Sequence, residues 1–309
     1  MLKLDQVKTD VHNDWCPGCG DFGILSALQQ SIVDLDRPSE KIAVFSGIGC
    51  SGKMPHFLNV YGIHTLHGRS LPIAMGAKIS NRDLTVIAVG GDGDGYGIGA
   101  GHFIATGRRN LDITYVVHNN GVYGLTKGQS APTLDRGLRT KSMSSPAIAE
   151  AVNPLALAIC AGYTFVARSY SNNVRHLKQT LRAAIDHNGT SLVDVLQPCP
   201  TYNDIHTKEY WAGSDREDKQ PRTYDLQEAG FDAVVQHSED GEEVLRKKAA
   251  GVSKALEPGE REPIGIFFQW KTSTFSERLA DRMPALLEKS LVDLEFSGRD
   301  VSPLFAELT

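Results

Sequence analysis

The sequence predicts an α/β protein with a largely parallel sheet and helices packed on both of its faces. From about residue 21 to residue 199, segments of helical periodicity alternate with short β-branched runs, the pattern of parallel strands joined by helices. Several of the expected strands run directly into glycine-rich or asparagine-containing loops. The chain has 309 residues, of which 41% are hydrophobic and 22% charged, so it can bury an ordinary globular core.

The clearest elements lie in the first half of the chain. Apolar residues at helical spacing predict a helix from Ile24 to Leu35, and the next run, Ile42–Phe45, predicts a buried strand. Two further strands are expected at Leu84–Val89 and Ile113–Val117. Because open α/β sheets bind ligands at the carboxyl ends of their strands, we expect a site where these three strands end.

The second half predicts the remainder of the sheet and a separate extension. The expected elements are a strand over 163–167, a helix over 173–187 and a strand over 192–196. Pro198 and Pro200 are expected to end the sheet. The composition then becomes polar, with one apolar run over 264–270 and an amphipathic helix from 276 to about 291. We therefore predict a site-bearing domain over 1–200 and a C-terminal extension over 201–309.

The charge balance argues against polyanionic partners. Lys and Arg number 32 against 37 Asp and Glu, a net charge of -5, which gives no reason to expect nucleic acid or an anionic membrane. Residues 1–5 carry charges where a signal peptide needs an apolar segment, and no later apolar run approaches membrane-spanning length. We expect a cytoplasmic protein that binds small molecules and other proteins.

Two strand ends carry oxygen ligands. Gly91-Asp92-Gly93 follows one expected strand, and Asn120 follows the next, at a distance that allows one helix and one strand between them. Asp92, the Asn120 amide oxygen and a nearby backbone carbonyl would suit Mg²⁺ together with substrate phosphate oxygens. An EF-hand beginning at Asp92 is excluded, because its fifth and twelfth positions are Tyr96 and Phe103.

Another glycine-rich loop, Gly47–Lys53, resembles the first part of a nucleotide-binding P-loop. Met54 stands where that motif needs a hydroxyl for Mg²⁺, and Pro55 is compatible only with the first helical turn, which argues against a triphosphatase. The segment His67-Gly68-Arg69 offers groups that could contact a diphosphate, although histidines in such places are more often structural.

The cysteines favour metal or redox chemistry over disulfides. Cys16, Cys19, Cys50 and Cys199 could meet in the predicted topology, and four thiolates suit either tetrahedral zinc or an iron–sulfur cluster. A thioredoxin-like dithiol is weaker, because no strand precedes Cys16. Cys160, in an apolar run, is expected to be a small core residue.

Taken in order, four motifs identify a family. They are Trp15-Cys16-Pro17-Gly18-Cys19-Gly20, Gly47-Ile48-Gly49-Cys50-Ser51, Gly91-Asp92-Gly93 with Asn120, and Val122-Tyr123-Gly124-Leu125-Thr126-Lys127-Gly128-Gln129. Over about residues 12 to 200 the chain resembles the β subunit of 2-oxoacid:ferredoxin oxidoreductases. The resemblance implies the diphosphate-domain type of the thiamine diphosphate-binding fold.

The resemblance also implies roles for individual residues. Cys16, Cys19, Cys50 and Cys199 would hold one [4Fe-4S] cluster, and Asp92, Asn120 and the Val122 carbonyl would hold the Mg²⁺ of thiamine diphosphate. The residues expected to bind the organic cofactor are Gly49, Ser51, His67, Gly68, Gly91, Gly93, Asp94 and Tyr123. Lys53, Arg69 and Leu125 are the candidates for substrate contact.

The implied reaction is the reversible oxidative decarboxylation of a 2-oxoacid with coenzyme A, giving an acyl-CoA, CO₂ and two electrons for ferredoxin, as in reductive carbon fixation. The ring-activating Glu, and therefore an aminopyrimidine domain, would come from a separate α subunit in an αβ or (αβ)₂ assembly. Overall similarity favours 2-oxoglutarate, which would yield succinyl-CoA, over other 2-oxoacids. The alternatives are a non-catalytic protein that binds a cluster or zinc, and a P-loop phosphohydrolase.

Overall fold

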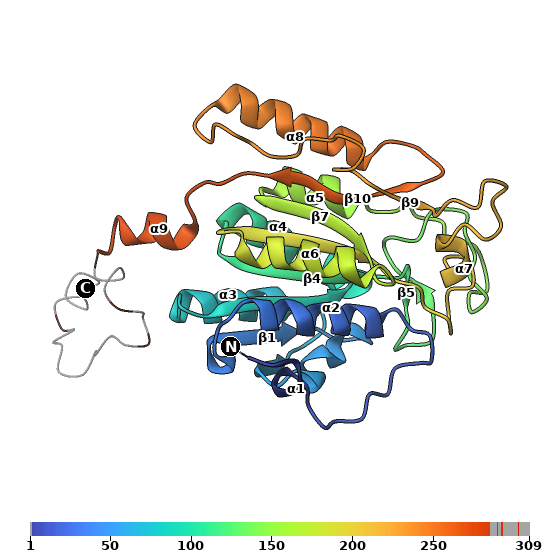
Figure 1. Cartoon of the computed structure of the whole chain (residues 1–309), viewed down its shortest axis with the longest axis horizontal. Coiled ribbons are helices and arrows are strands. Elements are labelled where there is room, and N and C mark those ends of the chain that lie inside the picture. Colours follow the sequence, from blue (N-terminus) through green and yellow to red (C-terminus); the bar gives the residue numbers. More distant parts are fainter. Residues whose placement is uncertain (1, 285–288, 290–291, 293–301, 303–309) are drawn as a thin grey trace.

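An eight-stranded sheet forms the centre of the protein in a computed structural model that describes every residue except 1, 285–288, 290–291, 293–301 and 303–309 (Figure 1). The strand order is β2-β1-β3-β4-β8-β7-β10-β9, and every neighbouring pair is parallel except β10 with β7. The strands of this sheet are β1 Ile42–Ser46, β2 Tyr61–His64, β3 Thr85–Gly91, β4 Ile113–Asn119, β7 Phe165–Tyr170, β8 Thr190–Leu196, β9 Thr223–Asp225 and β10 Glu262–Gln269.

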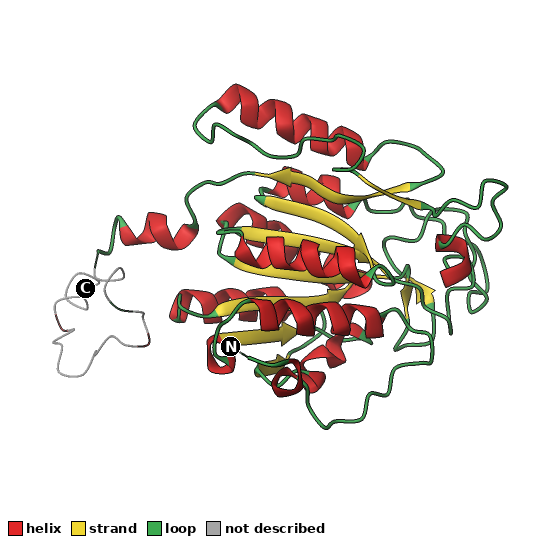
Figure 2. Cartoon of the chain, in the orientation of Figure 1, coloured by secondary structure: helices red, strands yellow, loops and turns green. Residues whose placement is uncertain are grey.

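Helices cover both faces of the sheet, as Figure 2 shows. They are α1 Leu4–Val7, α2 Asp21–Asp34, α3 Ser70–Ser80, α4 Ala100–Arg109, α5 Pro154–Ala161, α6 Val174–Asp186, α7 Lys208–Trp211, α8 Gly241–Ala255 and α9 Phe275–Ala280. Apolar side chains of α2 and α6 join one buried cluster, while those of α3, α4, α5 and α8 join another. The predicted class, a largely parallel sheet between two helical layers, is confirmed.

Alternate side chains along each central strand pack against the helical layers on the two faces of the sheet. In β1, Ala43 and Phe45 belong to the cluster beneath α3 and α4, whereas Ile42 and Val44 belong to the cluster beneath α2 and α6. Successive residues of a strand point to opposite faces, so a strand that is covered on both sides must be apolar throughout. This is why the sequence shows these strands as continuous apolar runs.

Several sequence predictions match the described elements closely. The helix expected at 24–35 is α2, and the helix expected at 173–187 is α6, whose N-cap is Asn173. The Asn173 side chain accepts a hydrogen bond from the backbone N–H of His176, which satisfies a donor that the first helical turn leaves free. The site-bearing strands 42–45, 84–89 and 113–117 correspond to β1, β3 and β4.

The prediction that the prolines near residue 200 end the sheet is wrong. β10 pairs antiparallel with β7, and β9 pairs with β10, so the segment after residue 200 adds two strands to the same sheet. Pro198 and Pro200 end only β8, because the chain leaves the sheet there and returns at Thr223 with β9 and at Glu262 with β10. The division of the chain at residue 200 stays a prediction.

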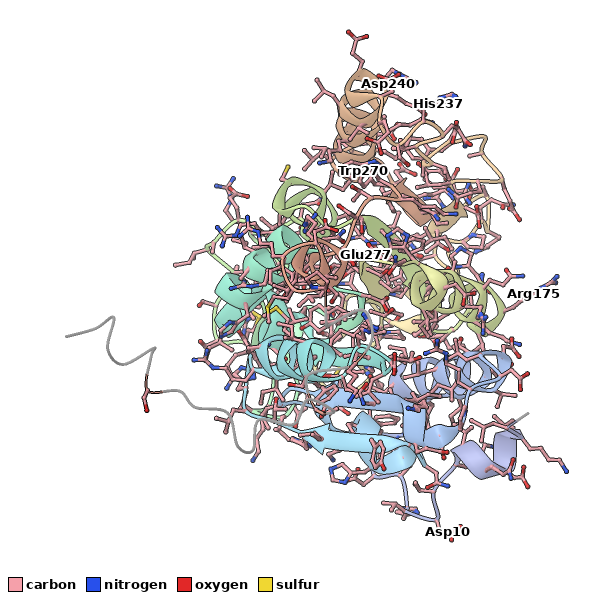
Figure 3. All side chains as sticks on the ribbon, turned by 90° about the vertical axis from the view of Figure 1, so that its left-hand side faces the viewer. Asp10, Arg175, His237, Asp240, Trp270 and Glu277 are labelled. Carbon is pink, nitrogen blue, oxygen red and sulfur yellow. The ribbon has the colours of Figure 1, made fainter. Side chains whose placement is uncertain are left out.

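The C-terminal segment also contains a well-capped helix. Asp240 accepts hydrogen bonds from the backbone N–H groups of Glu242 and Glu243 and so begins α8, which lies beyond β10 (Figure 3). The helix expected from 276 to about 291 is α9, which ends at Ala280. Part of the remaining range, 285–288 and 290–291, lies outside the described residues.

Cys160 is exposed, so its prediction as a core residue is wrong. It belongs to α5, whose buried positions are Pro154, Leu155, Ala158 and Ile159, and it falls on the opposite side of that short helix. None of the helices within the described residues combines the length and the hydropathy needed to cross a bilayer.

Candidate functional site

The candidate site lies at the carboxyl edge of β1, β3 and β4. A cavity of about 220 Å³ opens there. Its lining residues are Ile48, Gly49, Cys50, Ser51, His67, Gly91, Asp92, Gly93, Asp94, His118, Asn120, Val122, Tyr123, Gly124, Leu125 and Thr126. The parallel sheet therefore brings three segments of the sequence together, as the strand-end argument predicts.

Asp92 is the buried acid of this cavity. It is 2% exposed, and burial raises the pKa of its carboxyl to about 6, although hydrogen bonds from Thr133, Gly121 and Gly93 act in the opposite direction. Its Oδ2 accepts from the backbone N–H of Gly121 at 2.8 Å, and its Oδ1 accepts from that of Gly93 at 3.0 Å. With a pKa of about 6 this carboxyl is mostly ionised at neutral pH, and a nearby cation would favour the ionised form further.

The neighbouring oxygens fit a hard cation. The Asn120 side chain donates from Nδ2 to Gln197 at 2.8 Å, which turns its Oδ1 towards the backbone N–H of Val122 at 3.0 Å. A carboxylate, an amide oxygen and the backbone carbonyl of Val122 are the ligand types that Mg²⁺ takes beside phosphate oxygens. All three residues expected to hold Mg²⁺ line the same cavity.

Asp94 holds two loops of the cavity wall in place. Its Oδ1 accepts hydrogen bonds from the backbone N–H groups of Ile48 at 2.9 Å and Gly68 at 2.7 Å, and it lies 2.9 Å from Nδ1 of His67. A Cβ at Gly47 would lie 2.0 Å from Asp94 Oδ2, so only glycine allows this close approach. Burial raises the pKa of Asp94, and the two backbone donors and His67 oppose that shift.

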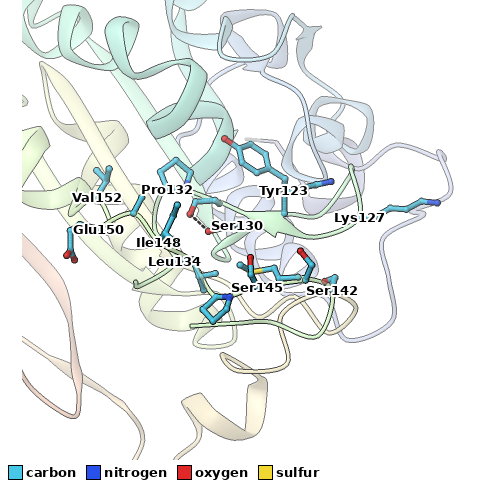
Figure 4. A pocket seen from close by; sticks show the side chains of 17 residues that line it. Tyr123, Lys127, Ser130, Pro132, Leu134, Ser142, Ser145, Ile148, Glu150 and Val152 are labelled. Atoms are coloured by element: carbon cyan, nitrogen blue, oxygen red, sulfur yellow. Dashed lines mark hydrogen bonds between the residues drawn. The ribbon is translucent and has the colours of Figure 1, made fainter. Parts of the chain in front are cut away.

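A second glycine keeps the cavity open beside an aromatic wall. A Cβ at Gly93 would lie 2.1 Å from Cε1 of Tyr123, whose hydroxyl donates to the Gly93 carbonyl at 3.3 Å. Tyr123 also lines a larger hollow of about 690 Å³ on its other side, formed mostly by the loop from Lys127 to Val152 (Figure 4). Tyr123 therefore stands between the two cavities.

Hydrogen bonds tie together the three segments that carry the four cysteines. The turn at Cys16–Cys19 closes through the Cys19 N–H and the Cys16 carbonyl at 3.0 Å. Gly20 N–H then donates to the carbonyl of Pro198 at 3.2 Å, one residue before Cys199. On the other side, Trp15 Nε1 donates to the carbonyl of Cys50 at 2.8 Å.

The thiols share one electrostatic neighbourhood. Burial raises the pKa of Cys50 to about 11, with further contributions from Asp21 and Cys199. Burial also raises the pKa values of Cys19 and Cys199. Among the described residues, however, no three His, Cys, Asp or Glu side chains converge as a metal site does. The thiol chemistry fits a soft iron or zinc centre, and a bound cation would favour the thiolates that burial disfavours.

Of the three residues expected to contact the substrate, one lines the cavity and two do not. Leu125 lines the cavity and is 53% exposed. Lys53 and Arg69 are not among the lining residues: Lys53 Nζ donates to Asp14 Oδ2 at 2.7 Å, and Arg69 contacts His102. Gly68 does not line the cavity either, and its backbone N–H donates to Asp94.

The sequence reasoning missed three residues beside the site. Nδ1 of His118 lies 2.5 Å from Oδ1 of Asp21, and Thr133 Oγ1 lies 2.5 Å from Oδ2 of Asp92. His118 directly precedes the asparagines at the end of β4, so the strand-end rule that found Asn120 could have found it. Nothing in the sequence pattern marks Thr133 or Asp21.

Models of known families match two parts of the chain. Residues 47–195 match "Thiamine pyrophosphate enzyme, C-terminal TPP binding domain". Residues 199–282 match the model for the C-terminal part of the pyruvate ferredoxin oxidoreductase beta subunit. The first match contains Asp92 and Asn120, and the second begins at Cys199.

Comparisons with individual proteins agree with these matches. The β subunit of a 2-oxoacid:ferredoxin oxidoreductase from Saccharolobus solfataricus is 51% identical over 304 residues, covering 96% of each chain. The 2-oxoglutarate oxidoreductase subunit KorB of Mycobacterium tuberculosis is 44% identical over 190 residues, covering 62% of this chain and 51% of that protein. A solved 2-oxoglutarate:ferredoxin oxidoreductase from Magnetococcus marinus, with 2-oxoglutarate, coenzyme A and succinyl-CoA bound, superimposes with a TM-score of 0.83 at 31% identity, covering 100% of this chain and 96% of that one.

Proposed function

The chain belongs to the family of 2-oxoacid:ferredoxin oxidoreductase β subunits, and from this premise we propose that it binds Mg²⁺–thiamine diphosphate and one [4Fe-4S] cluster in the oxidative decarboxylation of 2-oxoglutarate. The observation that carries the proposal is the position of Asp92. This buried carboxyl faces a glycine-walled cavity that also contains Cys50, so the expected cation site and one of the four thiols share a wall.

We assign the chain's own groups as follows. Asp92, the Asn120 amide and the Val122 carbonyl hold Mg²⁺, whose charge offsets that of the diphosphate. Gly49, Ser51, Gly91 and Gly93 let the diphosphate approach the backbone closely, and Tyr123 closes the cavity wall. His67 and Gly68 act through Asp94, which fixes the loops that carry them. When bound, thiamine diphosphate supplies the carbon nucleophile and the electron sink for decarboxylation.

The cysteines provide the exit for the electrons. Cys16, Cys19, Cys50 and Cys199 hold the cluster, which passes electrons one at a time to ferredoxin. We place the ring-activating Glu in an α subunit, in an αβ or (αβ)₂ assembly in the cytoplasm. Coenzyme A is the acyl acceptor, as the ligands of the Magnetococcus marinus enzyme suggest. We propose that the reaction is reversible, and that its reverse direction fixes CO₂ in a reductive tricarboxylic acid cycle.

The preference for 2-oxoglutarate rests on the KorB relatives and on Lys53. The relatives named for 2-oxoglutarate include KorB of Mycobacterium tuberculosis and of Archaeoglobus fulgidus, at 44% and 40% identity. A distal carboxylate that loses water inside a pocket needs a cation. Lys53 is the first candidate and Arg69 the second, with Leu125 contacting the carbon chain. For Lys53 to serve, its ammonium must exchange Asp14 for the substrate.

Anaerobic purification of the chain together with its α subunit tests the proposal. Analysis of iron, sulfide, zinc and thiamine should find about four irons and four sulfides per chain, with thiamine diphosphate and little zinc. Decarboxylation should require both subunits, because the ring-activating Glu is assigned to the partner. Zinc without iron or thiamine would instead support a non-catalytic scaffold.

A further inference from the structure

A buried chain of hydrogen bonds leads away from the cofactor cavity behind Asp92. Thr133 Oγ1 lies 2.5 Å from Asp92 Oδ2 and 2.8 Å from Asn119 Oδ1. The Asn119 amide nitrogen donates in turn to both oxygens of Asp194, at 3.2 and 3.3 Å. These contacts connect the acid at the end of β3 with the middle of β8, two strands away.

This series of hydrogen bonds continues into the C-terminal part of the sheet. Asp194 is fully buried, and it accepts hydrogen bonds from the Tyr96 hydroxyl and from Nε of Arg168, both at 2.9 Å. A second nitrogen of Arg168 donates to Glu262 at 2.8 Å, at the start of β10. The buried guanidinium, which has donors only, thus lies between the carboxylates of Asp194 and Glu262.

The donors and acceptors fix the orientation of each group. Asn119 turns its NH₂ towards the two oxygens of Asp194, and the Asn119 amide oxygen therefore faces Thr133. Thr133 thus lies between two acceptors but has a single hydroxyl proton. The ionised carboxylate of Asp92 is the stronger acceptor and the nearer one, so the hydroxyl donates to Asp92 Oδ2.

This bond restricts the rotation of the Asp92 carboxylate. Oδ2 is held by two donors, Thr133 and the backbone of Gly121, whereas among the described residues Oδ1 accepts only from the backbone of Gly93. Oδ1 is therefore the oxygen with acceptor capacity left for a ligand. Without the hydroxyl, the carboxylate would keep one backbone donor on each oxygen and would turn more freely.

We propose that Thr133, oriented by Asn119 and Asp194, is a positioning residue that presets the Asp92 carboxylate for the divalent cation of the cofactor. The inference rests on the proposed function, because it takes Asp92 as a ligand of that cation. It also gives a role to the buried Arg168–Asp194 pair, which anchors the end of the hydrogen-bond series that is farthest from Asp92. Partners that orient a metal ligand typically change metal affinity by about tenfold to a hundredfold when removed.

The test is a titration of the αβ complex, stripped of cofactor, with Mg²⁺ at saturating thiamine diphosphate, followed by tryptophan fluorescence. Thr133→Val keeps the shape of the side chain and removes the hydroxyl, and it should raise the Mg²⁺ dissociation constant roughly tenfold or more. Thr133→Ser keeps the hydroxyl and should stay within about threefold of wild type. At saturating Mg²⁺, kcat of the Val variant should recover, since only the preset orientation is lost.

Asp92→Ala distinguishes a failure of the positioning role of Thr133 from a failure of the proposed cation site. If Asp92→Ala abolishes Mg²⁺ binding while Thr133→Val matches wild type, the positioning role is wrong and the proposed cation site stands. If Asp92→Ala binds Mg²⁺ normally, the proposed site fails and the role of Thr133 with it. Should Thr133→Val not assemble with its partner, Thr133→Ala replaces it, and loss of affinity in Ala but not in Ser supports the proposal.

Discussion

The imidazole Nδ1 of His118 lies 2.5 Å from Oδ1 of Asp21, and both side chains are 1% exposed. The contact joins the end of β4 to the first residue of α2. On its other side, Asp21 Oδ2 lies 3.4 Å from the Cys19 sulfur, while His118 lines the cavity at the carboxyl edge of the sheet. This buried pair therefore fixes the position of the cysteine turn relative to the cavity.

Breaking this pair should loosen the cysteine turn. His118→Leu leaves the Asp21 carboxyl buried without its partner, and such a loss costs about 1–3 kcal/mol for an uncharged hydrogen bond and more for a charged one. Hydrogen exchange of a peptide covering residues 16–23 should speed up by roughly tenfold. His237→Leu is the matched control, because that side chain is 81% exposed and lies near α8, far along the chain (Figure 3). Equal exchange in the two variants would contradict the structural role of the pair.

Adding one methyl group at Gly93 should weaken cofactor binding. The Cβ of Gly93→Ala would meet the Tyr123 ring at 2.1 Å, so the ring or the Gly93 backbone must move. Overpacking of this kind costs about 1–3 kcal/mol, so the thiamine diphosphate dissociation constant from calorimetry should rise roughly tenfold. Gly101→Ala, in α4, is the control, because its Cβ would have no neighbour within 4 Å. A Gly93 variant with the affinity of the control would show that Tyr123 does not shape the binding cavity.

Replacing any one of Cys16, Cys19, Cys50 or Cys199 by Ala should remove the broad visible absorbance of an iron–sulfur cluster, since each is assigned one of four thiolates. Cys160→Ala should leave the spectrum unchanged, because this exposed thiol lies on α5 and is assigned to no ligand position. Iron analysis after anaerobic purification checks the assignment. Full iron retention in the Cys199 variant would remove that residue from the ligand set.

The substrate role of Lys53 predicts a change in selectivity. Lys53→Ala should lower kcat/KM for 2-oxoglutarate by roughly tenfold or more and affect pyruvate or 2-oxobutyrate less, because only the diacid needs a cation for its distal carboxylate. Asp14→Asn removes the ion-pair partner at 2.7 Å but keeps the ammonium, so it should retain the preference for the diacid. If Lys53→Ala lowers both substrates equally, the lysine serves the cofactor or the fold instead.

His187 should make the stability of the fold depend on pH. It is 4% exposed, and burial, followed by the charge of Lys271, lowers its pKa from 6.5 to about 4. The native state therefore resists a proton that the unfolded state accepts below pH 6.5, so stability falls as the pH drops from 6.5 towards 4. The loss between pH 7 and pH 5 should be about 2 kcal/mol in chemical denaturation. His187→Gln should remove this part of the pH dependence, and an unchanged slope in that variant would refute the assignment.

The sequence was sufficient for the elements whose signal is local. β1, β3 and β4 are buried on both faces and so appear as unbroken apolar runs, and the strand-end rule placed Asp92 and Asn120 at one edge. It was insufficient for contacts between distant segments. Nothing local to Glu262 shows that β10 pairs antiparallel with β7, nor that His118 faces Asp21, which lies 97 residues earlier. Such pairings depend on how the whole chain packs.

The order of strands in the sheet has a consequence for biosynthesis. β8 inserts between β4 and β7, although β7 precedes it in the sequence, so the centre of the sheet stays open until residue 196 has left the ribosome. At ordinary synthesis rates Cys199 follows Cys50 by on the order of ten to thirty seconds. During that interval the earlier thiols have no enclosing wall from β8. A cluster held by all four cysteines, as proposed above, can therefore be completed only once Cys199 has emerged and β8 has closed the sheet.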